Sequence, residues 1–531
     1  MAAPSPLEKP IVSADEAVTR IADGATVAIG GSGSGHAVPE KLLAALGRRF
    51  REQGRPSGLT LVHPFGVGNQ KDRGLQHLAH PGMFRRVVGG HWSMSPAMAQ
   101  LAVDNCFEAY CLPAGVIIQL FQAAAAGWPG VLTHVGLETF IDPRLEGGKL
   151  NQSAKDDLVE LINCDGQNHL FYRTIPIDVS LIFAGTADPY GNLSMNGQAA
   201  PWHNCAMAQA ARACGGITIA VVNRVVEPHG IHPRDVRVPG CFVDCVVLDP
   251  EQGQTYQTRS DPTFSGDARK PDSEFPSFPL STRKVIARRA ALELAPGAVL
   301  NVGFGLPDGV IKVAREEGLA STFIPTIEHG QFGGVPADGL DFGATYNADA
   351  VLETGHMFSF YHGRGVDQAY LGFLQVDRAG NVNVSRLGST IIGIGGFIDI
   401  AQRARKLVFC GTLGVRAEFE LTASGLRCVK QGAPKFVERA AQVTFSGDYA
   451  RRLEREVWYV TEAAVFSLSK DGIRLEEIAP GLNLEGDILP QLGFVPPMAD
   501  PLRTMPSELF GEGPLPRHLF RYYAAQPARE W

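Results

Sequence analysis

Two short apolar segments that end in glycine constrain the fold of this chain more than any other feature. Residues 25–30 (ATVAIG) and 298–303 (AVLNVG) are each followed by a stretch with helical spacing, one beginning at Pro39 and the other at Pro307. A buried strand, a glycine turn and a helix make up the repeating unit of a parallel sheet. Because strands and helical stretches alternate along the whole sequence, it predicts an α/β fold.

The two segments also align with each other, which predicts an internal duplication. The residues from Gly24 align without gaps on those from Gly297, and residues 177–195 align on residues 366–384. Both members of the second pair contain Asp-x-x-Gly-Asn, a turn in which Asp and Asn can bond the nearby backbone. Generic resemblance among α/β strands is the alternative explanation. We favour two similar open α/β domains, with loops inserted unequally between the paired segments.

A polar segment over residues 251–284 marks the boundary between the halves. It is rich in Pro, Ser and Asp and has no hydrophobic periodicity, which is typical of a linker. We therefore expect an N-terminal domain over residues 1–250, a linker over 251–284 and a C-terminal domain over 285–531.

Two stretches of the C-terminal half lead to expectations about its surface. Arg288 and Arg289 lie in a stretch with helical spacing, where we expect them to form a solvated face. The tail from Gly493 is rich in proline, and we expect it to wrap around the surface.

Charge and composition exclude several classes of protein. The net charge of -7 disfavours nucleic acid as a partner, because binding across a broad face needs clustered cations. The sequence has no apolar run long enough for a membrane span, and its N-terminus lacks the pattern of a secretory signal. Nine cysteines without a CxxC spacing indicate reduced thiols. We expect a cytoplasmic protein that forms a homo-oligomer, a dimer or a tetramer.

Three glycine clusters follow predicted strands and are candidate ligand loops. Small residues let backbone N–H groups approach a phosphate, a carboxylate or an oxyanion. Neither of the first two loops has a clean Gly-x-Gly-x-x-Gly pattern, so a nicotinamide site is disfavoured. Simple tight turns are the alternative for these two loops. The glycines that we single out are Gly33 in the first cluster, Gly303 and Gly305 in the second, and Gly393, Gly395 and Gly396 in the third.

Glu328 is the most informative candidate for chemistry. An apolar strand from Phe323 runs directly into this residue, and His329, Gly330 and further glycines follow. A carboxylate at the C-terminal end of a parallel strand lies where open α/β sheets bind their ligands. A solvated or salt-bridged glutamate is the alternative. The glycines favour a nucleophile instead, because a carboxylate among them can meet backbone donors.

Other catalytic motifs are weaker or missing. His77 and His80, and likewise His229 and His232, have helical spacing but no acidic or thiol residues beside them, so we expect no metal site. The phosphate-binding pattern Gly-x-x-x-x-Gly-Lys-Ser/Thr does not occur, which disfavours ATP-driven chemistry. The Gly-x-Ser-x-Gly elbow of serine hydrolases does not occur either.

Taken together, these segments resemble the family I coenzyme A transferases, in particular the acetate/propionate CoA-transferase branch, in which the α and β halves are fused. The resemblance runs nearly from end to end. The blocks that carry it are GGSGSGHAVPE (30–40), GGHWSMSP (89–96), EAYCLPAGVIIQL (108–120), THVGLETFIDPRLEGGKLN (133–151), NVGFGLPDGV (301–310), IEHGQFGGVPADGLDFG (327–343) and GIGGFIDIAQRARKLVFCGTL (393–413).

The resemblance implies a fold and a mechanism. The fold is a pair of open α/β domains with the active site at their interface. The family's catalytic glutamate falls on Glu328, whose carboxylate would attack an acyl-CoA and pass through a mixed anhydride to a glutamyl-CoA thioester. A second carboxylic acid would then take the CoA in a ping-pong cycle. Acyl-CoA and short carboxylic acids are the implied substrates, and no cofactor is needed because one thioester is exchanged for another.

The resemblance also implies roles for other residues. The family's Gly-x-Gly-Gly-Phe motif falls on residues 393–397, where Gly395 and Gly396 would contribute to an oxyanion hole and to contacts with CoA. Gln119 lies in a block that resembles the pocket for the incoming acid, although an exposed helical glutamine is the alternative. Gly33 belongs to a first loop that reads GGSGSGH instead of the GGFG of two-subunit relatives, a departure that bears on acyl preference.

Three other functions remain open at this point. An acyl-CoA hydrolase on the same scaffold would let water intercept the glutamyl-CoA. A ligand-sensing α/β module would bind a sugar phosphate or nucleotide without turnover, and a nicotinamide-dependent dehydrogenase is the most distant of the three. Each has its own test. CoA release without an acceptor acid would indicate the hydrolase, turnover of acetyl-CoA with propionate would exclude the sensing module, and the absence of thermal protection by NAD would exclude the dehydrogenase.

Overall fold

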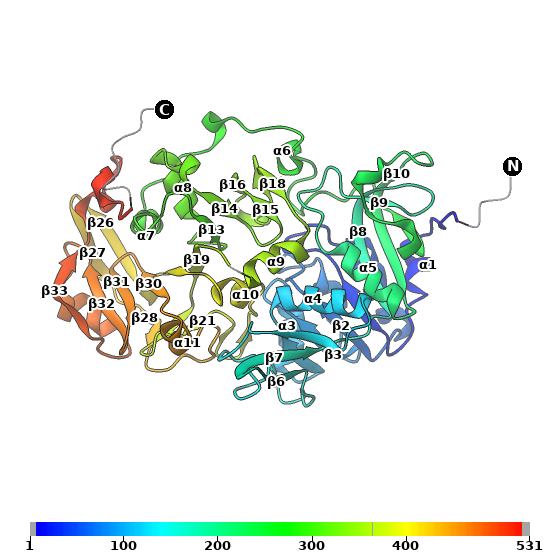
Figure 1. The fold of residues 1–531 in the computed structure, drawn as a ribbon, viewed down its shortest axis with the longest axis horizontal. Coiled ribbons are helices and arrows are strands. Elements are labelled where there is room, and N and C mark those ends of the chain that lie inside the picture. The colour runs from blue at the N-terminus through cyan, green and yellow to red at the C-terminus, as the bar shows by residue number, and fades with distance from the viewer. Residues whose placement is uncertain (1–6, 364, 523–531) are drawn as a thin grey trace.

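Each half of the chain builds its own sheet, with the N-terminal half on the right of Figure 1 and the C-terminal half on the left. The computed structural model describes residues 7–363 and 365–522. The first sheet has a parallel core in the order β12-β10-β8-β1-β2-β3-β4, and the short strands β9 and β11 continue from the end of β8. Its strands are β1 (Thr26–Ile29), β2 (Leu59–His63), β3 (Phe84–Gly89), β4 (Glu108–Cys111), β8 (Val179–Ala187), β9 (Leu193–Ser194), β10 (Ile217–Val225), β11 (Val236–Val238) and β12 (Cys245–Leu248).

The second sheet repeats the parallel arrangement and then extends it. Its order is β18-β15-β14-β13-β19-β24-β30-β31-β32-β33, and the strands from β14 to β30 are parallel. The bounds are β13 (Val299–Val302), β14 (Ile324–Thr326), β15 (Gln331–Phe332), β18 (Ala350–Val351), β19 (Gln368–Gly372), β24 (Lys406–Cys410), β30 (Glu456–Val460), β31 (Ala464–Ser469), β32 (Gly472–Ile478) and β33 (Met498–Thr504).

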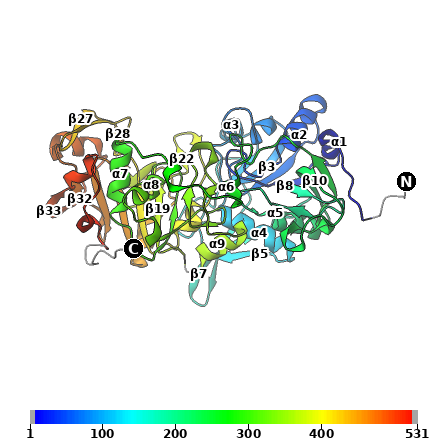
Figure 2. The ribbon, with the colours of Figure 1, turned by 90° about the horizontal axis from the view of Figure 1, so that it is seen from above.

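Smaller sheets decorate both halves. The hairpin of β6 and β7 projects from the body in Figure 2, and β5 pairs with its second strand. The short strands are β5 (Gly130–Thr133), β6 (Val159–Cys164), β7 (Gln167–Arg173), β16 (Val335–Pro336), β17 (Thr345–Tyr346), β20 (Gln375–Asp377), β21 (Val382–Asn383), β22 (Arg386–Leu387), β23 (Thr390–Ile391), β25 (Gly414–Val415), β26 (Glu418–Thr422), β27 (Gly425–Lys430), β28 (Ala433–Pro434) and β29 (Phe436–Val437).

Helices cover both faces of the first sheet and join the two halves. In Figure 2, α1 to α3 lie above this sheet, and α4 and α5 lie below it. Helix α4 also packs against α9 and α10 of the second half, so it is one of the elements that connect the halves near the site. Within the described residues, no helix has both the length and the apolar character needed to cross a bilayer. The helices are α1 (Ala14–Val18), α2 (Glu40–Gln53), α3 (Pro96–Val103), α4 (Ala114–Ala125), α5 (Asn204–Ala213), α6 (Pro262–Ser265), α7 (Thr282–Ala291), α8 (Gly309–Glu316), α9 (Thr354–His362), α10 (Phe397–Ala401) and α11 (Gly447–Arg452).

The strand register confirms the predicted duplication. The two apolar segments of the alignment are β1 and β13, and the second aligned pair contains β8 and β19. Val27 pairs with Val179 in the first half, and Leu300 pairs with Gln368 in the second. These are the positions that the sequence alignment equates, so the α/β fold and its repeat were both predictable from the sequence.

The aligned Asp-x-x-Gly-Asn turns also have the same hydrogen bonds. Asp188 Oδ1 accepts from the Asn192 backbone N–H at 3.0 Å, and Asp377 Oδ1 accepts from the Asn381 backbone N–H at 3.0 Å. In each turn the asparagine amide then donates to the other carboxylate oxygen, at 2.9 and 3.0 Å. The shared motif is therefore a structural turn in both halves.

The segment predicted as a linker is packed between the two halves. The first sheet ends with β12, and α7 begins at Thr282, before the predicted end of the linker at residue 284. Thr255 is buried and donates from its Oγ1 to Asp341 Oδ1 at 2.5 Å. The Tyr256 N–H donates to the Ser34 carbonyl at 2.7 Å. This segment therefore connects the first glycine loop to residues of the second half.

The expectation of a solvated arginine face on α7 is wrong. Arg288 and Arg289 are only 2% and 4% exposed. The C-terminal tail covers this helix, and Arg288 donates to the carbonyls of Glu508, Gly511 and Gly513 at 2.5–3.0 Å. The tail wraps around the surface as expected, but it also supplies an edge strand, β33. A helical pattern alone cannot show which later segment will cover a charged face.

Candidate active site

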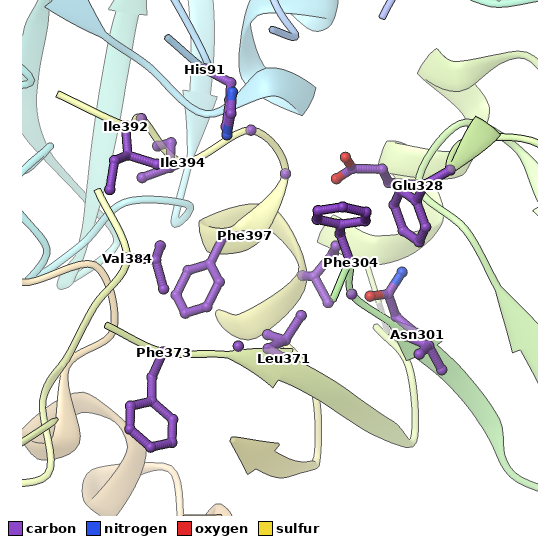
Figure 3. A pocket seen from close by; sticks show the side chains of 18 of the residues that line it. His91, Asn301, Phe304, Glu328, Leu371, Phe373, Val384, Ile392, Ile394 and Phe397 are labelled. Atoms are coloured by element: carbon purple, nitrogen blue, oxygen red, sulfur yellow. The ribbon is translucent and has the colours of Figure 1, made fainter. Parts of the chain in front are cut away.

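A cavity of about 390 Å³ opens at the C-terminal ends of the parallel strands of the second sheet. Figure 3 shows Glu328 pointing into it from one side, with apolar side chains on the other sides. Asn301 comes from the end of β13, Glu328 follows β14, and Leu371 lies on β19. His91 is the lining residue that comes from the first half. The cavity is therefore built on the second half and closed by the first.

A forced turn after β14 places Glu328. Gly330, two residues later, has φ = +126°, and a Cβ there would lie 2.1 Å from the Leu352 carbonyl oxygen. Only glycine fits that position without moving the backbone. The side chain of Glu328 is 22% exposed, and in Figure 3 its carboxylate faces the cavity. The expected strand-end position is the one that the structure shows.

The surroundings of Glu328 disfavour its ionised form. Burial raises the pKa of Glu328 to about 8, and the nearby Asp399 carboxylate contributes to that rise, while a hydrogen bond from the Gly396 N–H opposes both. His329 Nε2 lies 3.8 Å from Glu328 Oε1 but adds no compensating charge, because burial lowers the pKa of His329 to about 3. The Ser32 hydroxyl bonds the same imidazole nitrogen at 2.9 Å.

The third glycine cluster forms the wall next to Glu328. The N–H groups of Ile394 and Gly395 both donate to the Gly90 carbonyl at 2.8 Å, and the Ala114 N–H donates to the Gly395 carbonyl at 2.9 Å. The first half thus holds this loop in place. Gly395 cannot supply the oxyanion donor that we expected, because its N–H is already bonded. Gly396 is the glycine that lies against Glu328, since a Cβ there would be 2.0 Å from Glu328 Oε2.

Gly393 shows why this wall needs glycine. Its φ is +86°, and a Cβ would lie 2.7 Å from the His91 Cα. All three glycines of this cluster line the cavity together with Glu328. Their expected contact with CoA stays a prediction.

The first and second glycine clusters contribute less to the cavity wall than the third cluster does. Gly303 lines the cavity, whereas Gly305 makes the turn behind it with φ = +95°, and a Cβ added there would meet no atom within 4 Å. Gly33 lies outside the lining, and its N–H donates to the Gly66 carbonyl at 2.6 Å. It reaches the site only indirectly, since its Cβ position is 3.8 Å from the Phe342 carbonyl oxygen.

Gln119 lies on α4 and does not line the cavity. Its Nε2 lies 3.0 Å from His362 Nδ1, and His362 Nε2 lies 2.7 Å from Asp399 Oδ1. Gln119 is therefore bonded to a buried chain of side chains and is not an exposed helical residue. Its expected role in holding the incoming acid stays a prediction.

Asn301 is a site residue that the sequence reasoning missed. It is 2% exposed, and its Nδ2 donates to the Tyr361 hydroxyl at 3.0 Å and to the Thr326 carbonyl at 3.3 Å. Its Oδ1 has no partner in the described structure. The available signal was a polar residue inside an apolar strand, at the position where the first repeat has Ala28.

Aromatic side chains make up much of the remaining wall. Phe304 is 62% exposed, and its ring centroid lies 5.0 Å from that of Phe342. Phe373 and Phe397 also line the cavity and are 5% and 8% exposed. A cavity with this lining can hold an extended apolar chain beside one reactive carboxylate.

The histidine pairs noted in the sequence play no part in this site. His77 Nε2 bonds Glu40 at 2.8 Å on the first half, a partner distant in sequence. Across residues 7–363 and 365–522, no group of three or more His, Cys, Asp or Glu side chains is arranged to hold a metal ion.

The curated proteins and the family model that this chain resembles are coenzyme A transferases. A family model for coenzyme A transferases matches residues 11–249. The acetate CoA-transferase YdiF of Escherichia coli K12 is 42% identical over 504 residues, which cover 94% of this chain and 95% of that protein. The caffeate CoA-transferase of Acetobacterium woodii is 40% identical over 510 residues, which cover 94% and 97%.

Two solved structures also match this chain over nearly its whole length. The apoenzyme of the acyl-CoA transferase YdiF from Escherichia coli O157:H7 superposes with a TM-score of 0.92 at 39% identity, covering 96% of this chain and 98% of that one. A thioester complex of that transferase with CoA gives a TM-score of 0.90 at 39% identity, covering 95% and 97%. The likeness extends over both halves of the chain.

Proposed function

Since this chain belongs to the coenzyme A transferase family, with both halves fused, we propose that it transfers CoA from a short-chain acyl-CoA to a short carboxylic acid through a covalent thioester on Glu328. The observation that carries the proposal is the Glu328 carboxylate, which faces a largely apolar cavity and lies so close to Gly396 that a Cβ there would be 2.0 Å from Oε2. A carboxylate with a raised pKa is a stronger nucleophile when it is ionised.

The cycle conserves one thioester and needs no cofactor. The ionised Glu328 attacks the acyl carbonyl carbon, the C–S bond breaks, and CoA thiolate leaves a mixed anhydride. The thiolate then attacks the Glu328 carbonyl carbon, and the original acid leaves as a carboxylate with the negative charge. A second acid anion attacks the glutamyl thioester and the same steps run in reverse. The Gly396 N–H can stabilise an oxyanion that forms on the glutamyl carbon.

A short acid such as acetate or propionate is the first candidate acceptor, because the acetate CoA-transferase relative matches nearly the whole chain. An aromatic acid of the caffeate kind is the second candidate. Phe304, Phe342, Phe373 and Phe397 all line the cavity, and aromatic walls favour an aromatic ligand. A panel of acetate, propionate and caffeate against one acyl-CoA donor ranks these acceptors by kcat/KM.

Mass spectrometry of the intact protein tests the covalent step. Incubation with an acyl-CoA and no acceptor should add the mass of CoA less one water, and peptide mapping should place it on Glu328. Glu328→Gln should abolish the adduct and the transfer. Glu462→Gln is the matched control, since Glu462 is also a buried glutamate whose pKa burial raises, to about 7, but it does not line the cavity.

Two results would overturn the proposal. Full transfer activity in Glu328→Gln would exclude a glutamyl thioester. Release of CoA at the same rate with and without an acceptor acid would favour hydrolysis over transfer.

A further inference from the structure

The first glycine loop, in the first half, reaches across to the residue that follows Glu328. The Ser32 hydroxyl lies 2.9 Å from His329 Nε2, and both residues are 3% exposed. The same Nε2 lies 3.8 Å from Glu328 Oε1. One imidazole nitrogen therefore has a hydroxyl within hydrogen-bond distance and a carboxylate just beyond it.

The backbone of the loop holds Ser32 in place. The Ser32 N–H donates to the His36 carbonyl at 2.9 Å, and the His36 N–H donates to the Ser32 carbonyl at 3.0 Å. Gly31, directly before Ser32, has φ = +88°, and a Cβ there would lie 2.6 Å from the His36 carbonyl oxygen. The Tyr256 N–H bonds the Ser34 carbonyl at 2.7 Å. Ser32 is thus presented to the second half by a loop that hydrogen bonds hold closed.

The imidazole of His329 is held between aromatic rings. Its ring centroid lies 4.9 Å from that of Trp202 and 5.0 Å from that of Phe65. Its Nδ1 is buried and has no hydrogen-bond partner in the part of the chain that the structure describes. Nε2 is therefore the nitrogen through which this side chain bonds.

Ser32 occupies the one hydrogen-bonding position of Nε2. A nitrogen of neutral imidazole either donates its proton or accepts one hydrogen bond. The hydroxyl can take the complementary role in both cases, because it is a donor and an acceptor. As long as it does, the Glu328 carboxylate receives no N–H from His329.

We propose that Ser32 is a positioning residue that keeps His329 from bonding Glu328, so that the Glu328 carboxylate stays free to attack an acyl-CoA. This inference rests on the proposed function, because it assigns a role in that attack. A carboxylate that accepts an imidazole N–H must give up this bond before it can bond to carbon, which slows the attack. The loop of the first half therefore controls the nucleophile of the second.

The histidines that face His329 carry no charge near neutral pH. Burial lowers the pKa of His36 to about 4 and that of His203 to about 3. Burial likewise lowers the pKa of His329 itself to about 3. The bond between Ser32 and His329 is therefore one between two neutral groups.

The titratable groups on the side of Glu328 do not contact Ser32 and are present in every variant proposed below. Burial raises the pKa of the Tyr361 hydroxyl far above neutrality and lowers the pKa of His91 to about 4. Burial also raises the pKa of Asp399, whose carboxylate contributes to the raised pKa of Glu328. A change in the pH profile that follows a substitution of Ser32 is therefore not caused by losing one of these groups.

Ser32→Ala is the direct test. Without the hydroxyl, His329 Nε2 can carry a proton and donate it to the ionised carboxylate, and hydrogen bonds to a charged acceptor are stronger than those to a neutral one. The ionised form of Glu328 is then favoured, so the acidic limb of kcat/KM should move to lower pH by about one unit. The plateau at high pH should fall by about tenfold, because the attack breaks that bond.

The shape of the profile distinguishes positioning from a structural role. With positioning, the profiles of the two proteins should converge at low pH, where Glu328 is protonated in both. A disturbed loop would instead lower kcat/KM by the same factor at every pH and leave the midpoint in place, which would overturn the proposal. Ser34→Ala is the matched control and should keep the wild-type profile, since Ser34 lies in the same loop, is 4% exposed and makes no side-chain bond to His329 in the described structure.

His329→Phe gives a second test, because it removes both ring nitrogens and keeps an aromatic ring beside Phe65 and Trp202. In this background Ser32→Ala should change neither the midpoint nor the plateau, since no nitrogen is left to bond Glu328. Equal shifts in the two backgrounds would show that Ser32 acts on Glu328 by another route, and the proposal would be wrong.

The outcomes also separate this proposal from the proposed function. If the wild-type protein forms no CoA adduct on Glu328, the thioester mechanism itself fails. If the adduct forms and Ser32→Ala keeps the wild-type midpoint and plateau, the role of Ser32 is wrong and the thioester mechanism stands.

Discussion

Gly396 and Glu328 are in such close contact that any side chain at position 396 would displace the Glu328 carboxylate. A Cβ on Gly396 would lie 2.0 Å from Glu328 Oε2, whereas its φ of -89° would accept an alanine without strain. The requirement for glycine therefore comes from the carboxylate and from the Phe358 ring, not from the backbone. A substitution of Gly396 therefore tests directly how the Glu328 carboxylate is placed.

We expect Gly396→Ala to remove the CoA adduct and to lower kcat/KM by at least about a hundredfold, because a displacement of about 1 Å at a reacting group has an effect of that size. The adduct is measured by intact mass and the transfer by acyl-CoA exchange. Gly511→Ala, where no atom lies within 4 Å of the Cβ position, is the control for a harmless methyl group. Near-normal adduct formation in Gly396→Ala would contradict the observed placement of Glu328.

The raised pKa of Glu328 predicts that this residue destabilises the folded protein at high pH. The folded state holds the pKa at about 8, against 4.5 for an unperturbed glutamate, so it binds the proton more tightly than the unfolded chain does. Stability is therefore highest below pH 4.5 for this group, falls between pH 4.5 and 8, and is constant above. The slope in that window is about 1.4 kcal/mol per pH unit.

Glu328→Gln removes this titration and should be more stable than the wild type at pH 8, with little difference near pH 5. Denaturant unfolding of both proteins at pH 5, 6.5 and 8 measures the difference in the free energy of unfolding. Titrations common to both proteins cancel in that difference. A gap that stays constant across the three pH values would mean that Glu328 is not protonated in the folded state.

Local sequence pattern and strand order were enough to predict the position of Glu328. Glu328 follows an apolar strand and precedes glycines, and a parallel sheet places that strand end at the ligand-binding edge. The repeat was predictable because Val27 and Leu300 lie in segments that align directly. The role of Gly395 was not predictable from the sequence, because only the folded chain brings the Gly90 carbonyl to the Gly395 N–H.

The buried polar chain shows what sequence patterns miss. Gln119 and His362 are 243 residues apart, and His362 and Asp399 are 37 apart, yet they are consecutive in the hydrogen-bond chain. Each looks like an ordinary helical polar residue in the sequence. Their burial depends on α4 of one half packing against α9 and α10 of the other, which no local pattern encodes.

Phe304 at the cavity mouth is expected to bind substrate without stabilising the fold. Its side chain is 62% exposed, so Phe304→Ala should change the free energy of unfolding by less than about 0.5 kcal/mol. The variant loses an aromatic surface that faces the cavity, and KM for the acyl-CoA should rise by about tenfold.

Steady-state kinetics with the acyl-CoA varied, together with denaturant unfolding, separates these effects. Val429→Ala on β27, at 58% exposure and outside the cavity lining, is the matched control. An unchanged KM in Phe304→Ala would show that the substrate does not contact this ring.

Arg289 connects α7 to the edge of the second sheet, and its loss should destabilise that half. It bonds Glu477 through two nitrogens at 2.8 and 2.9 Å and Glu293 at 3.0 Å, and all three side chains are less than a tenth exposed. Removing one partner of a buried ion pair leaves an uncompensated charge, which costs about 3–5 kcal/mol. Because Lys406 still pairs with Glu293 at 2.5 Å, we expect the lower end of that range for Arg289→Met.

The matched control is Arg427→Met, which breaks an exposed pair with Glu420 on the β26–β27 hairpin and should change stability by less than about 1 kcal/mol. The double variant Arg289→Met with Glu477→Gln should recover part of the loss, because it removes the stranded carboxylate as well as its partner. Denaturant unfolding of the four proteins measures these differences. Equal losses in the single and double variants would mean that Arg289 stabilises the half by packing against Trp458, whose ring lies 5.5 Å from its guanidinium carbon, and not by its charge.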